Sequence, residues 1–221
     1  MRGFFVGWRD RVRSVLYALG MSAEARKRIP VPLVLFVGAY MVVFSGLALR
    51  AGNAEFAVYA GAMVVFIGLA AFLHLRFGLR RSTLWLLAVW GLLHMAGGTV
   101  AIPAEWADAG GSVLYSLRLH PLTPRYDQAV HAFGFFAASL ACFDVLSRLV
   151  RHDAGQPRVG LAVVSALMGC GLGALNEVLE FAITLTVPDH NVGGYVNTGW
   201  DLVSNLIGAC AAGVVIVVRR R

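Results

Sequence analysis

The 221 residues are 58% hydrophobic and only 14% charged, with a mean hydropathy of +0.71. An average soluble domain carries about 25% charged residues, so these values exclude an ordinary soluble domain and indicate a protein that crosses a membrane several times. The formal net charge of +7 does not indicate nucleic-acid binding, because the basic residues gather in the segments around and between the apolar stretches.

Residues 1–28 are basic and amphipathic. Apolar residues recur at helical spacing from Phe4 to Leu19, and arginines lie between them. This pattern predicts an amphipathic helix in the membrane interface. It does not predict a signal peptide, because the arginines interrupt the stretch before an apolar core of about 7–15 residues can form.

Six apolar stretches follow, each close to the roughly 20 residues that an α-helix needs to cross a bilayer. Their expected limits are 31–50, 55–75, 83–103, 127–149, 159–184 and 201–218. We therefore expect an all-α fold. The six transmembrane helices would form one domain, residues 29–221, and the interfacial segment 1–28 would precede it.

The distribution of positive charge orients this predicted bundle. Most Lys and Arg residues lie in the N-terminal segment, in the 76–81 and 148–158 loops and at the C-terminus, whereas the opposite loops carry only Arg50, Arg118 and Arg125. By the positive-inside rule, both termini are expected in the cytoplasm.

Polar residues occur at a similar depth in the last four predicted helices. At about 1.5 Å per residue they lie roughly 20–28 Å from the basic end of each helix, in the outer half of a hydrocarbon core about 30 Å thick. They are His94, His131, Glu177, Asp201 and Asn205, with Asp127 and Glu180 near the outer boundary. Such residues normally face the interior of a bundle, so we expect them to form one outward-facing intramembrane site.

Glu177 and Glu180 carry the strongest signal for such a site. At i, i+3 they share a helix face near the C-terminal end of their helix, where mutual repulsion, the helix dipole and the low dielectric all oppose two negative charges. A cation, a proton or a metal ion has to compensate for them. Asp127 with His131, and Asp201 with Asn205, are i, i+4 pairs that each occupy one helix face.

Carboxylates together with imidazoles suit a divalent ion such as Zn, Mn or Fe. The expected metal ligands are Asp127, His131, Glu177 and Asp201. Glu177 or Glu180 would be the catalytic general base. The residues expected to surround the metal ligands or to contact a substrate are His94, Arg125, Asn176 and Asn205.

Simpler interpretations of single residues stay open. Asp201 has nearly the spacing of a helix-capping residue, and Asp127 suits the first turn of a helix. Arg125 or a histidine could pair with Glu177 in a purely structural network. Asp144 could pair with Arg148 at i, i+4.

Four motifs occur in a fixed order along the chain, namely LHMAGG from Leu93, RYDQAVHAFG from Arg125, NEVLEF from Asn176 and WDLVSNLIGA from Trp200. Over roughly residues 83–210 they resemble the YjdF-type bacterial inner-membrane proteins. The order of the polar residues is more distantly similar to VanZ-like membrane proteins, a group associated with glycopeptide resistance and the cell envelope. The resemblance implies a multi-pass protein of the bacterial inner membrane, and it implies no particular reaction.

The leading hypothesis is a divalent-metal-dependent enzyme that acts on a lipid or cell-envelope precursor. A small proton- or ion-coupled transporter is one alternative, since buried carboxylates can carry protons. A non-catalytic membrane scaffold with a buried polar network is another. The polar residues stop halfway across the predicted bundle, which favours a site over a transport pathway.

Overall fold

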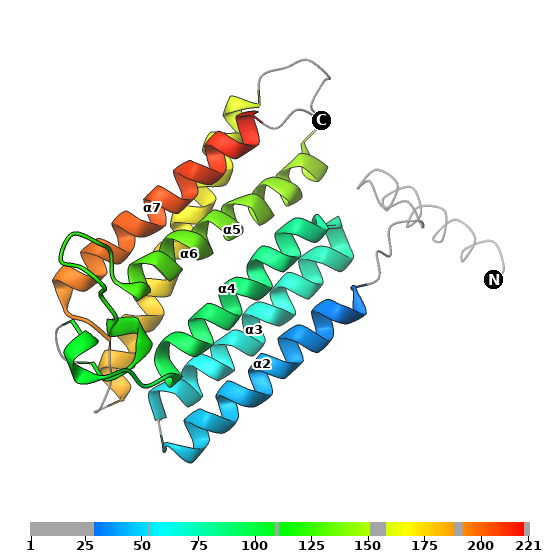
Figure 1. Cartoon of the computed structure of the whole chain (residues 1–221). Helices are drawn as coiled ribbons and strands as arrows, with labels where there is room; N and C mark the ends of the chain where they lie inside the picture. Colours follow the sequence, from blue (N-terminus) through cyan, green and yellow to red (C-terminus); the bar gives the residue numbers. More distant parts are fainter. Residues whose placement is uncertain (1–28, 53, 109–110, 151–157, 188–191, 219–221) are drawn as a thin grey trace.

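The computed structural model describes residues 29–52, 54–108, 111–150, 158–187 and 192–218. Within these ranges the regular structure is entirely helical, which confirms the predicted all-α class (Figure 1). The six long helices are α2 (Val31–Arg50), α3 (Ala54–Phe77), α4 (Arg81–Thr99), α5 (Tyr126–Leu149), α6 (Val159–Thr186) and α7 (Tyr195–Val218). The predicted interfacial helix falls in residues 1–28, outside the described part of the chain.

Five of these helices are long and apolar enough to cross a membrane, namely α2, α3, α5, α6 and α7. The helix α4 does not meet the same measure: it has 19 residues and begins with the polar sequence Arg81-Ser82-Thr83. The structure therefore supports an integral membrane protein with five candidate spans. The role of α4 as a sixth span is a prediction that the helix lengths alone do not decide.

The helices are arranged in two groups of three (Figure 1). The first consists of α2, α3 and α4, and the second, more closely packed, consists of α5, α6 and α7; α4 packs against α5 between them. Small residues allow the close packing of the second group. Gly208 of α7 lies against the carbonyl oxygen of Ala132 in α5, and Gly173 of α6 lies against Asn205 of α7. These contacts bring the polar faces of three helices together.

Two helix limits differ by more than two residues from those predicted. The last helix begins at Tyr195 rather than at residue 201, so Asp201 lies inside α7 and does not cap it. The helix α4 ends at Thr99 rather than at residue 103, because the backbone is already extended at Val100. The earlier start of α7 adds Asn197 to the helix face that carries Asp201 and Asn205.

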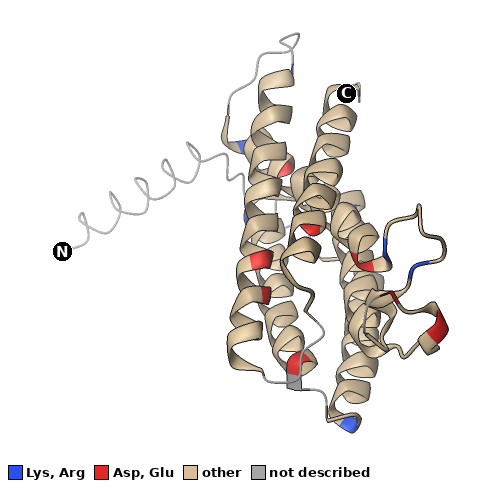
Figure 2. Ribbon diagram, turned by 90° about the vertical axis from the view of Figure 1, so that its left-hand side faces the viewer, with Lys and Arg blue, Asp and Glu red and all other residues tan. Residues whose placement is uncertain are grey.

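The connection between α4 and α5 covers one end of the bundle, beside the start of α7 (Figure 1). It contains two 3-10 turns, η2 (Ala104–Trp106) and η3 (Leu114–Ser116). Backbone hydrogen bonds between Ile102 and Ser112, and between Leu114 and Val100, tie its two halves together. Most of the acidic residues lie in the half of the molecule near this end, away from the C-terminus (Figure 2).

Candidate functional site

His131 lies at the centre of the acidic cluster that the sequence predicts, and its side chain is only 7% exposed. On one side of the ring, Nε2 lies 3.5 Å from Asp127 Oδ1 and 3.7 Å from Glu180 Oε1. On the other side, Nδ1 lies 3.5 Å from Glu177 Oε1 and 3.1 Å from Asn205 Oδ1. Side chains from α5, α6 and α7 therefore meet around one imidazole.

Asn205 determines which nitrogen of His131 is available. The amide oxygen of Asn205 can only accept a hydrogen bond, so Nδ1 of a neutral ring carries the hydrogen and donates it. The lone pair of Nε2 then faces Asp127 and Glu180. In metal-binding histidines, the ring nitrogen that does not bind the metal usually donates such a hydrogen bond, which orients the ring.

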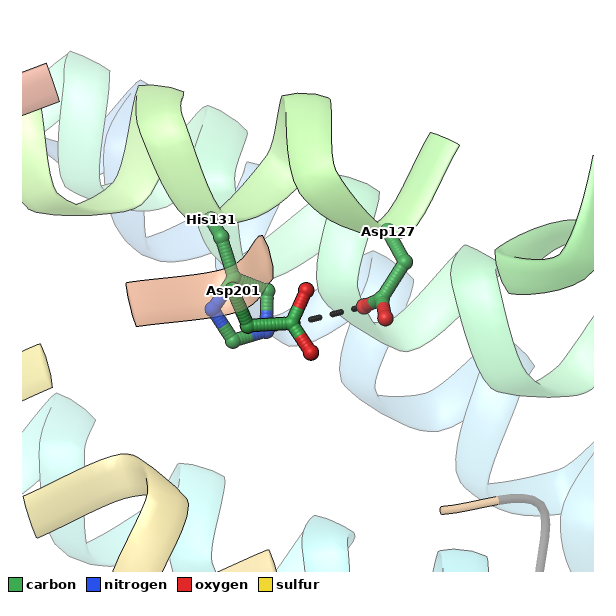
Figure 3. Close-up of side chains that lie close together, drawn as sticks. All are labelled: Asp127, His131 and Asp201. Atoms are coloured by element: carbon green, nitrogen blue, oxygen red, sulfur yellow. Dashed lines mark ion pairs between the residues drawn. The ribbon is translucent and has the colours of Figure 1, made fainter. Parts of the chain in front are cut away.

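Asp201 has no solvent exposure, and only one of its oxygens is satisfied. Its Oδ2 accepts a hydrogen bond from Asn197 Nδ2, which also lies 3.4 Å from Asp127 Oδ2. Among the described residues, Asp201 Oδ1 has no hydrogen-bond partner. Figure 3 shows the side chains of Asp127 and Asp201 close to the His131 ring, with the ion pair between His131 and Asp127 dashed.

Of the four acids around His131 (Asp127, Glu177, Glu180 and Asp201), Glu177 forms the fewest hydrogen bonds. It is 8% exposed, and neither carboxylate oxygen has a hydrogen-bond partner in the described part of the structure. Glu180, one turn further along α6, accepts a hydrogen bond of 2.9 Å from Asn176. A buried carboxylate without a hydrogen bond costs several kcal/mol, and one imidazole cannot neutralise four acids, so the cluster requires protons or a cation for which the described side chains do not account.

Two sets of side chains in this cluster have the spacing of metal ligands. The first is Asp127, His131 and Asp201, and the second is His131, Glu177 and Glu180. In each set the potential ligand atoms lie within 4.8 Å of one another. Ligands on opposite sides of an ion with bonds of about 2.1 Å are roughly 4.2 Å apart, so small side-chain movements would close either set around one ion.

Asn176 and Asn205 bond to members of these sets, whereas the other two predicted residues, His94 and Arg125, form their described bonds elsewhere. His94 is surrounded by aromatic rings, and its Nδ1 lies 2.5 Å from the hydroxyl oxygen of Tyr115. Arg125 caps the start of α5, and its Nε lies 3.5 Å from Asp108 Oδ2 in the preceding connection. In the described structure Arg125 therefore pairs with Asp108, not with Glu177.

Asn197 contributes to the site and Tyr115 bonds to His94, and neither residue was predicted. Asn197 is four residues before Asp201, and this spacing could have indicated a shared helix face. The glycines around Asn197 suggested a loop instead. Tyr115 comes from the long connection and contacts both Nδ1 and the carbonyl oxygen of His94. Burial raises the pKa of Tyr115 well above its usual range, so its hydroxyl group remains a hydrogen-bond donor.

Comparison with known proteins identifies the family without assigning a reaction. The sequence profile of the family described as "Predicted membrane protein (DUF2238)" matches residues 32–221, which includes all six long helices but the first residue of α2. No curated protein and no solved structure matches the chain. The YjdF-type proteins that the four motifs resemble are this family. The chain therefore belongs to the DUF2238 family of predicted membrane proteins.

Proposed function

We propose that the protein is a divalent-metal-dependent enzyme of the bacterial inner membrane that acts on a lipid or cell-envelope precursor. The observation that carries the proposal is the group of unsatisfied carboxylate oxygens on Glu177 and Asp201, buried beside the single imidazole of His131. Carboxylates with one imidazole form a donor set suited to Mn, Fe or Zn. When bound, such an ion would lower the pKa of a water molecule for hydrolysis.

The distances support a specific division of roles. Because Nδ1 of His131 donates to Asn205, Nε2 is the nitrogen available as a ligand, and Asp127, Asp201 and Glu180 are the carboxylates suited to that side of the ring. Glu177 lies on the Nδ1 side, and neither of its oxygens has a hydrogen-bond partner among the described residues. It is therefore our candidate for the general base, while Glu180, which the sequence also suggested for that role, takes a ligand position.

The proposed topology places this site at the outer face. It comprises a domain of six spans over residues 29–221, with α4 as the third span, preceded by the interfacial segment 1–28. Both termini would be cytoplasmic, since Arg76, Arg80 and Arg81 lie at the end of the bundle opposite His131. A substrate from the outer leaflet or the envelope would reach the acidic cluster without crossing the membrane.

Metal content tests the proposal directly. Purified full-length protein would be loaded with Zn, Mn or Fe, desalted and measured by mass spectrometry, beside the His131→Gln and Asp201→Asn variants. Asp144→Asn is the matched control, because Asp144 is also a buried carboxylate on α5 but belongs to neither ligand set. We expect about one ion per wild-type and control chain and none in the two site variants.

The opposite results would decide against an enzyme of this kind. Absence of metal from the loaded wild type, with all variants still folded by size-exclusion chromatography, would mean that protons neutralise the cluster. Equal metal in all four proteins would place the ion elsewhere. Screening of envelope lipids for hydrolysis is justified only when the expected pattern is observed.

A further inference from the structure

A second polar pocket lies at the basic end of the bundle, far from His131. It has a volume of about 200 Å³ and is lined by α5, by the start of α6 and by the segment between α3 and α4. Its charged residues are Arg80, Asp144, Arg148 and Arg158. Among the described lining residues, Arg80 and Arg148 already outnumber the one acid, whatever Arg158 contacts, so the pocket is positive. Asp144 is 13 residues from His131 along α5, roughly 20 Å away at about 1.5 Å per residue.

The single acid of this pocket is already compensated. Asp144 is buried, and its Oδ1 lies 3.3 Å from Arg80 Nε. Its Oδ2 accepts hydrogen bonds from the backbone N–H of Arg80 at 2.9 Å and from the hydroxyl group of Thr83 at 2.7 Å. In the described part of the chain Asp144 thus pairs with Arg80, whereas the sequence spacing had suggested Arg148.

These bonds also hold Arg80 at the pocket wall. Its guanidinium group lies over the ring of Phe143, 5.5 Å from the ring centre, while 47% of the side chain remains exposed. An arginine fixed through Nε and a ring face, with part of its surface open, is arranged to bind an anion with little loss of side-chain entropy.

Two helix N-termini add to the positive potential. The helix α4 begins immediately after Arg80, and α6 begins immediately after Arg158. Neither N-cap side chain bonds to its own helix and neither helix has an acidic residue in its first turn, although Asp144 accepts a hydrogen bond from the backbone of Arg80 at the start of α4. The positive ends of two helix dipoles therefore meet a pocket that already carries three arginines, which favours an anion with several oxygens.

We propose that this pocket binds the phosphate group of an anionic membrane lipid. Arginines bind phosphate oxygens through paired N–H donors, and basic pockets between transmembrane helices are known to accept acidic lipid headgroups. The pocket lies at the ends of the membrane helices, at the level of the headgroups, and Phe143 and Leu161 supply an apolar wall beside the arginines. The inference does not depend on the metal site.

Thermal unfolding of the purified full-length protein tests this assignment. Phosphatidylglycerol, phosphatidylcholine and glycerol 3-phosphate would be titrated separately into detergent-solubilised protein. The pocket variant is Arg148→Gln with Arg158→Gln, which leaves the Arg80–Asp144 pair intact. The matched control is Arg76→Gln with Arg81→Gln, which removes two positive charges from the same end without changing the lining of the pocket.

We expect phosphatidylglycerol to raise the melting temperature of the wild type and of the control. The pocket variant should need at least about tenfold more lipid for the same rise. Equal rises in melting temperature in the two variants would overturn the proposal, because the effect of the lipid would then depend only on net charge. An equal rise with phosphatidylcholine would also overturn it. An equal rise with glycerol 3-phosphate would overturn the lipid assignment and indicate that the pocket binds a soluble phosphate ester. If the double variant does not fold, Arg148→Gln alone tests the same point, since Arg148 is exposed.

Discussion

At the scale of single residues, Glu177, whose oxygens form no hydrogen bond in the described structure, gives a prediction with a definite sign. In metal-free protein, Glu177→Gln removes a buried negative charge from a cluster of four acids, so we expect the free energy of unfolding to rise by about 1 kcal/mol. Thermal unfolding in the presence of a chelator measures it. Glu105→Gln, on the exposed turn η2, should change nothing. A clear loss of stability in Glu177→Gln would instead indicate a structural ion pair with His131.

Asn205 provides the second prediction at this scale. Replacing it with Leu keeps the size of the side chain but removes the acceptor for His131 Nδ1, so we expect metal affinity to fall by about 10–100-fold. Ser204→Ala is the control, because Ser204 lies on the same turn and, within the described residues, bonds only the carbonyl oxygen of Trp200. Competition with a metal chelator measures both. An unchanged affinity in Asn205→Leu would refute the orienting role of the amide.

At the scale of the helix, the contact between α5 and α7 positions half of the candidate site. A Cβ at Gly208 would collide with the carbonyl oxygen of Ala132, which is backbone and cannot move aside. We expect Gly208→Ala to lower the free energy of unfolding by about 1–3 kcal/mol and to weaken metal binding, since Asp201 and Asn205 move with α7.

Gly213 is the matched control on the same helix. Its Cβ would lie 3.9 Å from the nearest atom, an ordinary contact, so Gly213→Ala should be neutral or should stabilise the helix by up to about 1 kcal/mol. Thermal unfolding compares the two. Equal losses in both variants would show that the α5–α7 contact at Gly208 does not determine the result, because helix propensity favours Ala over Gly at both positions.

At the scale of the whole molecule, the distribution of charge predicts the orientation in the membrane. Single cysteines would replace Leu122, in the connection before α5, and Arg81, at the opposite end; both positions are exposed. The native Cys142, Cys170 and Cys210 would first be replaced with Ala. A membrane-impermeant maleimide should label Leu122→Cys in intact cells, and Arg81→Cys only after permeabilisation. The reverse pattern would place the acidic cluster on the cytoplasmic side.

The long apolar helices could be predicted from the sequence because hydrophobicity and helical length are local properties. The limits of α2 agree with the prediction, and those of α5 and α6 agree to within two residues. The start of α7 does not, because its first turn contains a polar residue, Asn197, that is buried by tertiary contacts. Asn197 is buried through its contacts with Asp127 and Asp201.

The sequence by itself determined that acidic residues and histidines occur at one depth, since spacing along a helix converts directly into height. Only the tertiary structure decided which of them meet. His131 lies among acids from α5, α6 and α7, whereas His94 on α4 contacts Tyr115 instead. The rotation of each helix about its axis makes this difference. Contacts such as Gly208 against Ala132 determine that rotation, and they join residues far apart in the chain.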